Sequence, residues 1–147
     1  MNRTEEIELL EQLEQWNSKD EYSQCIQAIE AIPEQERGYL LTVKLSRAYS
    51  NLAVLGDHGV HGTDGEVDGD LIRHAIDLLE SVRTQGENDP YWNSRMGYSC
   101  LMAYRSAATA YEYAKCWLAL ARMPQPLKSW FGTARNIWRR KKLWSWI

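Results

Sequence analysis

The chain has 147 residues, of which 44% are hydrophobic and 25% are charged. This composition is typical of a globular domain and excludes disordered, collagen-like and disulfide-scaffold proteins. The net charge of −3 conceals two opposed parts, because residues 1–121 carry −10 and residues 122–147 carry +7. Four of the seven tryptophans also lie in residues 122–147, so an acidic body is followed by a basic, tryptophan-rich tail.

Several sequence features indicate a cytoplasmic protein. The N-terminal segment lacks the basic start and apolar core of a secretory signal, and no apolar run approaches the roughly 20 residues that span a membrane. Cys25, Cys100 and Cys116 are widely spaced without CxxC pairs. This spacing favours reduced thiols in a reducing compartment.

Hydrophobic periodicity predicts an all-α protein without strands. Apolar residues recur at spacings of three and four, which places them on one stripe of each helix. In the first helix this stripe runs from Ile7 through Leu10 and Leu13 to Trp16. The expected helices cover residues 7–16, 22–32, 39–55, 71–82, 91–104 and 106–121.

Local signals predict where some of these helices begin and end. Ser18 and Glu21 have the spacing of a capping box that opens the second helix, and Pro33 ends that helix. Asp89 followed by Pro90 is typical of an N-cap and the first residue of a helix, here the fifth.

Residues 56–70 interrupt the helical pattern. They contain five of the nine glycines and five acidic residues, a composition that cannot bury enough apolar surface to order itself. The last seven residues of this segment match the start of an EF-hand loop, but the twelfth position, which must supply a bidentate carboxylate, is Ala75. His58 and His61 are two zinc-ligand types, but no further ligands complete a site. We therefore expect a solvated insertion with no metal ion and no cofactor.

The sequence contains no recognisable catalytic constellation. It lacks a glycine-rich phosphate loop, the GxSxG and HExxH motifs, and a cysteine with a recognisable base. We expect that the protein is not an enzyme.

Two segments of the chain indicate an internal repeat. Arg47–Leu52 (RAYSNL) and Met96–Leu101 (MGYSCL) align at an offset of 49, which equals the 34-residue tetratricopeptide period plus the 15-residue insertion. Ala110–Ala121 looks like the second helix of such a repeat, and Gly97 looks like the small residue of a first helix. On these residues, 3–121 resemble the tetratricopeptide-repeat family.

The resemblance implies a fold of three antiparallel helix pairs, stacked as a short superhelix, and no catalytic activity. The segment from Cys25 to Tyr49 is also similar to uncharacterised bacterial proteins that carry such repeats. In the family the concave face, lined by the first helix of each pair, is the partner surface. Carried over by position, the groove residues are Thr42, Tyr49, Tyr91, Ser94 and Tyr98.

The function that follows is a scaffold that binds a protein or peptide of unknown identity in this groove. A second interpretation of Tyr49 and Tyr98 is that both are half-buried aromatic residues that pack the fold. Ala48 and Gly97 are expected at points of close helix approach, where a large residue overpacks the contact.

The basic tail, residues 122–147, allows two further functional readings. Tryptophan together with lysine and arginine favours the surface of an anionic membrane. The same combination of basic and aromatic residues suits single-stranded nucleic acid. Membrane or nucleic-acid association through the tail is therefore the alternative to groove binding.

A third hypothesis treats the tail as an out-of-frame product. On this hypothesis the gene is read one base late from about Arg122. The original reading frame can then encode an alanine before Pro124, followed by a helix-forming sequence that contains acidic residues again. The boundary then falls where the proline that ends a tetratricopeptide repeat is missing. A repeat stack that lacks its polar cap exposes apolar surface, which predicts self-association through the C-terminal end.

Overall fold

The computed structural model describes residues 1–59 and 67–105, and these residues form an all-α structure. No strand occurs among them, which confirms the predicted fold class. Five of the six expected helices lie in this part and are present, whereas the sixth, at 106–121, and the tail at 122–147 lie outside the described residues. The helices are α1 (Arg3–Ser18), α2 (Tyr22–Glu30), α3 (Gly38–Leu55), α4 (Gly69–Ser81), α5 (Arg83–Gly86) and α6 (Pro90–Arg105), with 3₁₀ turns η1 (Glu34–Glu36) and η2 (Asp57–Gly59).

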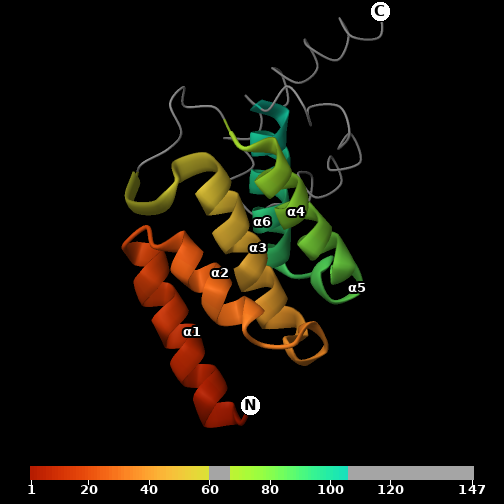
Figure 1. Ribbon diagram of the computed structural model, residues 1–147. Helices are drawn as coiled ribbons and strands as arrows, with labels where there is room; N and C mark the ends of the chain where they lie inside the picture. Colours follow the sequence, from red (N-terminus) through yellow and green to blue (C-terminus); the bar gives the residue numbers. More distant parts are fainter. Residues whose placement is uncertain (60–66, 106–147) are drawn as a thin grey trace, which may run out of the picture.

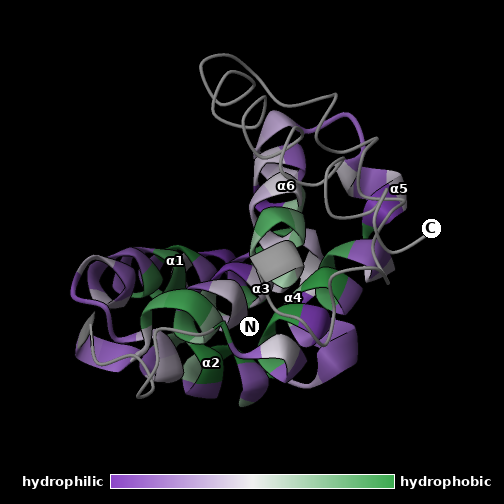
Figure 2. Ribbon diagram, turned by 90° about the horizontal axis from the view of Figure 1, so that it is seen from above, coloured by the Kyte–Doolittle hydropathy of each residue, from purple (hydrophilic) through white to green (hydrophobic). Residues whose placement is uncertain are grey.

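The long helix α3 lies at the centre of the described body. It packs against α2 on one side and α4 on the other, and α6 packs against both α4 and α3 (Figure 1). Hydrophobic segments of α2, α3 and α4 lie toward the middle of the body (Figure 2). The helix expected to pair with α6, at 106–121, lies outside the described residues, so the stack of three helix pairs stays a prediction.

Two hydrophobic clusters hold the helices together. The first joins α1, α2 and α3 through Leu13, Cys25, Ile29, Leu41, Leu45 and Ala48. The second joins α3, α4 and α6 and includes Val43, Ala53, Ile72, Ile76, Leu79, Trp92 and Met96. In α2, α4 and α6, and for Leu41, Leu45 and Ala48 of α3, these residues recur at spacings of three and four, as the apolar stripe of a helix requires. Val43 and Ala53 of α3 belong to the second cluster, so α3 is buried on more than one side.

Helix α1 is attached by a narrow part of its predicted stripe. Leu13 is its one fully buried residue, Leu10 and Trp16 are half-buried, and Ile7 is 48% exposed. The helix begins with a capping box in which Asn2 accepts the backbone N–H of Glu5 and the Glu5 carboxylate accepts that of Asn2. Each satisfies a backbone donor at the helix N-terminus that has no partner within the helix.

The predicted capping box at the start of α2 is wrong. Helix α1 continues through Ser18, whose hydroxyl donates to the carbonyl of Gln15, and Glu21 makes no side-chain cap bond. The carboxylate of Asp57 caps α2 instead, because its Oδ1 accepts the backbone N–H of Ser23 at 2.9 Å and its Oδ2 accepts the Ser23 hydroxyl. This cap comes from 34 residues away, so no local pattern could identify it.

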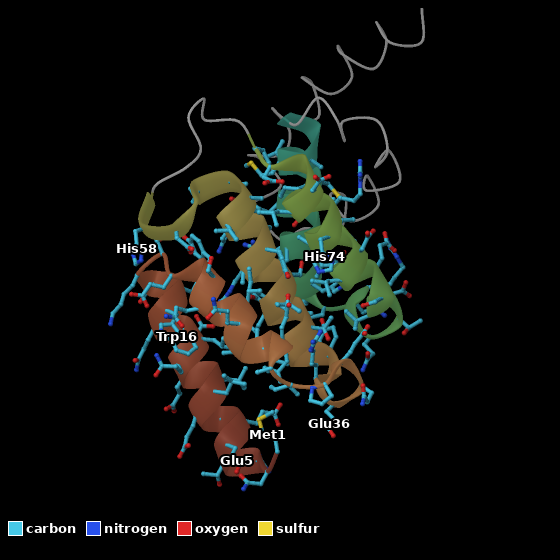
Figure 3. The ribbon with its side chains drawn as sticks, viewed as in Figure 1. Met1, Glu5, Trp16, Glu36, His58 and His74 are labelled. Atoms are coloured by element: carbon cyan, nitrogen blue, oxygen red, sulfur yellow. The ribbon has the colours of Figure 1, made fainter. Side chains whose placement is uncertain are left out.

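The two ends of the predicted insertion 56–70 are ordered parts of the fold. The backbone N–H of His58 donates to the carbonyl of Asp20 at 2.8 Å, which holds η2 against the turn between α1 and α2 (Figure 3). At the other end Val67 is buried and Asp68 is the N-cap of α4, which begins two residues earlier than expected. Composition alone therefore overestimated the solvated segment, because it cannot register burial or capping at a segment's ends. Residues 60–66 lie outside the described part.

Helices α4 and α6 are joined by α5, a short helix that periodicity did not predict. Gly86 ends α5 and is buried against Trp92, whose indole Nε1 donates to the carbonyl of Leu79 at 2.9 Å. The predicted start of α6 is confirmed: the helix begins at Pro90, and Asp89 Oδ1 accepts the backbone N–H of Tyr91 at 3.0 Å.

The cysteines agree with the sequence expectation only in part. Cys25 is a free, buried thiol whose Sγ contacts the carbonyl of Leu13 at 3.6 Å. Cys100 is buried as well but is disulfide-bonded, so the expectation of reduced thiols is wrong for this residue. Cys116 lies outside the described residues.

Among the described helices, none combines the length and the hydropathy that crossing a bilayer requires.

Candidate functional site

Polar side chains of α1, α3 and α6 form a set of contacts in two groups, and the groups meet on α3, where the Ser50 hydroxyl donates to the carbonyl of Arg47 at 3.0 Å. We call this set the polar cluster. Its members are Glu14 and Asn17 of α1, Lys44, Arg47, Ser50 and Asn51 of α3, and Tyr91, Arg95 and Tyr98 of α6.

Glu14 links α1 to two cations of α3. Its Oε1 lies 2.9 Å from Lys44 Nζ and 2.9 Å from Arg47 Nη1, and its Oε2 lies 3.2 Å from the same Nη1. Lys44 also reaches α6, where its Nζ lies 3.4 Å from the hydroxyl of Tyr91 and 4.8 Å from the centre of that ring. Lys44 and Arg47 are three residues apart, which places both on one stripe of α3.

Arg95 links α6 to α3 in the same cluster. Its Nη2 donates to the hydroxyl oxygen of Ser50 at 2.6 Å and to Asn51 Oδ1 at 3.3 Å, and its guanidinium lies 4.6 Å from the centre of the Tyr98 ring. Asn51 in turn donates to Asn17 Oδ1 of α1 at 3.1 Å. The cluster therefore connects the three helices through charged and amide groups rather than through apolar packing.

Positive charge exceeds negative charge in the polar cluster. Lys44, Arg47 and Arg95 supply three cations, and Glu14 is the single carboxylate among the members. Burial lowers the pKa of Arg95, whereas the two neighbouring cations hold the pKa of Glu14 below its usual value although partial burial acts in the opposite direction. The Nε atoms of Arg47 and Arg95 are buried and have no hydrogen-bond partner within the described residues. Such a group favours a nearby anion.

Three of the five groove residues predicted from the sequence lie on α6. Tyr91 and Tyr98 belong to the polar cluster. Ser94 lies between them in the sequence, and its hydroxyl donates to the carbonyl of Pro90 at 2.8 Å. The structure therefore brings Tyr91 and Tyr98 together with cations that the sequence analysis did not single out.

The other two predicted groove residues, Thr42 and Tyr49, lie elsewhere on α3. The hydroxyl of Thr42 donates to a carbonyl of its own helix at 2.7 Å. Tyr49 donates to the carboxylate of Glu30 in α2 and meets the ring of His74 in α4 edge-to-face, with 4.5 Å between ring centres. Tyr49 and Lys44 are five residues apart, about 140° around a helix, so Tyr49 lies on a different face of α3 from Lys44.

The packing interpretation of Tyr49 and Tyr98 fits both residues. Each is half-buried and lies against one of the two hydrophobic clusters. Burial, together with the bond to Glu30, raises the pKa of Tyr49 to about 12. Tyr49 is thus engaged by α2 and α4, while Tyr98 combines packing with its contact to Arg95.

Sequence reasoning missed the charged members of the polar cluster. A signal was present: Lys44, Arg47 and Asn51 follow one another at spacings of three and four inside an otherwise apolar helix. Tyr91, Arg95 and Tyr98 repeat that spacing in α6. Polar stripes of this kind mark a surface that is kept out of the hydrophobic core, although they do not reveal which helices share it.

The described residues contain no group of three or more histidine, cysteine or acidic side chains that could hold a metal ion. Asp68, a ligand position of the EF-hand match, uses its carboxylate to accept the backbone N–H groups of Asp70 and Leu71. Ala75, at the twelfth position, is fully buried in α4. His61, Asp64 and Glu66 lie outside the described residues.

Comparisons with known proteins add no functional residue to this site. No protein-family model matches the chain. Neither a curated protein nor a solved structure matches it. The contacts and charges of the polar cluster are therefore the basis for assigning a function.

Proposed function

We propose that this chain is a non-enzymatic scaffold that binds an acidic peptide segment of a partner protein at the polar cluster. In the tetratricopeptide-like arrangement expected from the sequence, α1, α3 and α6 are the first helices of three successive pairs. The first helices line the partner surface in that family. The polar cluster draws its side chains from these three helices, which supports the proposal.

The observation that carries the proposal is the unbalanced charge of the cluster. Arg95 makes its hydrogen bonds to the neutral oxygens of Ser50 and Asn51, while Lys44 and Arg47 share the single carboxylate of Glu14. A carboxylate of a bound peptide offsets the remaining positive charge and accepts charge-assisted hydrogen bonds. Such bonds are worth on the order of 1.5–3 kcal/mol each.

The test is the affinity of the full chain for a fluorescein-labelled octaglutamate peptide, followed by fluorescence anisotropy. Lys44→Gln should weaken binding about tenfold, because it removes a charged contact worth about 1.4 kcal/mol or more. Lys19→Gln is the matched control, since Lys19 is exposed and lies outside the polar cluster. Circular dichroism establishes that both variants are folded. Equal affinities of the two variants would refute binding at the polar cluster.

The basic tail favours a second candidate function, association with an anionic membrane surface or with single-stranded nucleic acid. Residues 122–147 carry seven positive charges and no negative charge, and this combination with tryptophan suits both ligands. A full-length variant with glutamine at Arg139, Arg140, Lys141 and Lys142 separates the candidates. If it loses binding to phosphatidylserine vesicles, oligothymidylate and octaglutamate alike, while Lys44→Gln binds normally, the tail is the binding element.

The out-of-frame hypothesis for the tail predicts self-association through the C-terminal end. Sedimentation velocity of the full chain tests that expectation, and the nucleotide sequence tests the hypothesis itself. The hypothesis would be excluded if the original reading frame contained a stop codon, or encoded a sequence that does not favour a helix, in the region of residues 122–147.

A further inference from the structure

Glu14 occupies the position in the polar cluster that a ligand carboxylate would take. One oxygen of Glu14 lies 2.9 Å from both Lys44 Nζ and Arg47 Nη1. The other oxygen lies 3.2 Å from the same arginine nitrogen. In the unliganded chain these two cations are therefore already paired with an internal acid.

The three side chains differ in their exposure to solvent. The side chain of Glu14 is 53% exposed, whereas those of Lys44 and Arg47 are 16% and 10% exposed. The carboxylate thus lies at the solvent end of two largely buried cations. An incoming acidic side chain meets Glu14 first, and it can reach these cations only where Glu14 turns away.

Moving Glu14 away from the cations needs no rearrangement of the helices. Leu13, the next residue, is fully buried and anchors α1 in the first hydrophobic cluster. Asn17, one turn further, is bonded to Asn51 of α3. The Glu14 side chain can rotate into solvent while both contacts hold α1 in place. The incoming carboxylate takes the place of Glu14 beside the same two cations, so the largely buried charges of Lys44 and Arg47 are paired before and after the exchange.

We propose that Glu14 is an internal competitor, which occupies Lys44 and Arg47 in the free protein and is displaced by a carboxylate of the acidic partner. This inference rests on the proposed function of the polar cluster. It assigns Glu14 a role in setting the threshold of binding: segments with several acids displace it, whereas a single weak acid does not. The ion pair of α1 with α3 is then part of the regulation of the site as well as part of the fold.

The experiment compares Glu14→Gln with Glu11→Gln in the full chain, using the labelled octaglutamate peptide. Glu11 lies on the same helix, is exposed and is not a member of the polar cluster, so both variants change the net charge equally. Glu14→Gln should bind about three- to fivefold more tightly than Glu11→Gln, because it removes one competing carboxylate from Lys44 and Arg47. The advantage should shrink when Lys44→Gln is added to both variants, because Arg47 is then the one member of the pair of cations for which Glu14 still competes.

The outcomes separate this inference from the proposed function. If Lys44→Gln weakens binding but Glu14→Gln and Glu11→Gln bind equally, the site stands and the competitor role of Glu14 is overturned. If Lys44→Gln has no effect, the site itself is wrong. An advantage of Glu14→Gln that is undiminished in the Lys44→Gln background also overturns the competitor role, because it then arises from general charge. Urea unfolding of each variant establishes that the comparison is made between folded proteins.

Discussion

Replacing Asp57 by alanine should destabilise the fold by about 2 kcal/mol. The carboxylate accepts the backbone N–H and the hydroxyl of Ser23, and Ser23 is the second residue of α2, where the backbone donor has no partner within the helix. Loss of a side-chain N-cap costs roughly 0.5–2 kcal/mol. The upper part of that range applies here because the bonds are charge-assisted and also tie η2 to α2 across 34 residues.

The effect of Asp57 should also depend on pH. Burial alone raises the pKa of Asp57, but hydrogen bonds from the hydroxyl and backbone of Ser23, the backbone of Tyr22 and the charge of His58 outweigh it, so this pKa lies below its usual value. A carboxyl group with a lowered folded-state pKa contributes stability above its unfolded pKa, about 3.9, and loses it as the pH falls through the folded-state value. The contribution of Asp57 is therefore complete at pH 7 and declines below about pH 4.

The assay is urea unfolding followed by circular dichroism at pH 7, 5 and 3. Asp57→Asn keeps an acceptor for the backbone of Ser23 and should cost about 1 kcal/mol at pH 7, with a smaller difference from the unmodified chain at pH 3. Asp77→Asn, at an exposed position of α4, removes the same charge and is the control. A loss below about 0.5 kcal/mol for Asp57→Ala, or a difference for Asp57→Asn that persists undiminished at pH 3, would refute the reasoning.

Three further substitutions and one labelling reaction test the packing. Gly86→Ala should lower the free energy of unfolding in urea by about 3 kcal/mol, because a Cβ there lies 2.2 Å from Cδ1 of the fully buried Trp92 ring. Gly38 has φ +67° and no atom within 4 Å of the position that an added Cβ would take, so Gly38→Ala should cost only about 1 kcal/mol of backbone strain. Equal losses of stability for the two variants would contradict this reasoning. Ala48→Leu should lower the melting temperature, because Ala48 is 2% exposed within the first hydrophobic cluster and overpacking costs about 1–3 kcal/mol. An unchanged melting temperature would mean that the cluster accommodates the larger side chain and would contradict the prediction. Burial raises the pKa of the Cys25 thiol to about 11, so labelling by a disulfide reagent, mapped to Cys25 by mass spectrometry, should follow unfolding, and rapid labelling of the native chain would count against its burial.

The helices themselves could be predicted because their signals are local. Leu13 and Ile29 lie on apolar stripes whose period is that of a helix, and both are fully buried. Asp89 and Pro90 open α6 through interactions within one turn. Signals of this range can be recognised in a sequence, because the interacting residues lie within four positions of each other.

The same local reasoning failed where a distant residue supplied the interaction. Ser18 and Glu21 have the spacing of a capping box, but α1 continues through Ser18. A competing cap, Asp57, is brought to the start of α2 by the packing of η2 against the α1–α2 turn. The neighbours of Tyr49 likewise come from distant parts of the sequence: Tyr49 contacts α2 and α4, and only the packing of α3 decides which of its faces each neighbour covers.

What the sequence by itself determined is the class of the fold, the position of most helices and the faces that they bury, because hydrophobic periodicity and the termini of α6 depend on neighbours within one or two turns. The tertiary structure decided which polar groups meet. Glu14 and Arg47 are 33 residues apart, and Ser50 and Arg95 are 45 apart. Their contacts exist because α2 packs against both α1 and α3 while α6 packs against α3, an arrangement set by apolar burial in the two hydrophobic clusters. Charge placed at helical spacing marks a surface, but only packing brings three such surfaces together as one site.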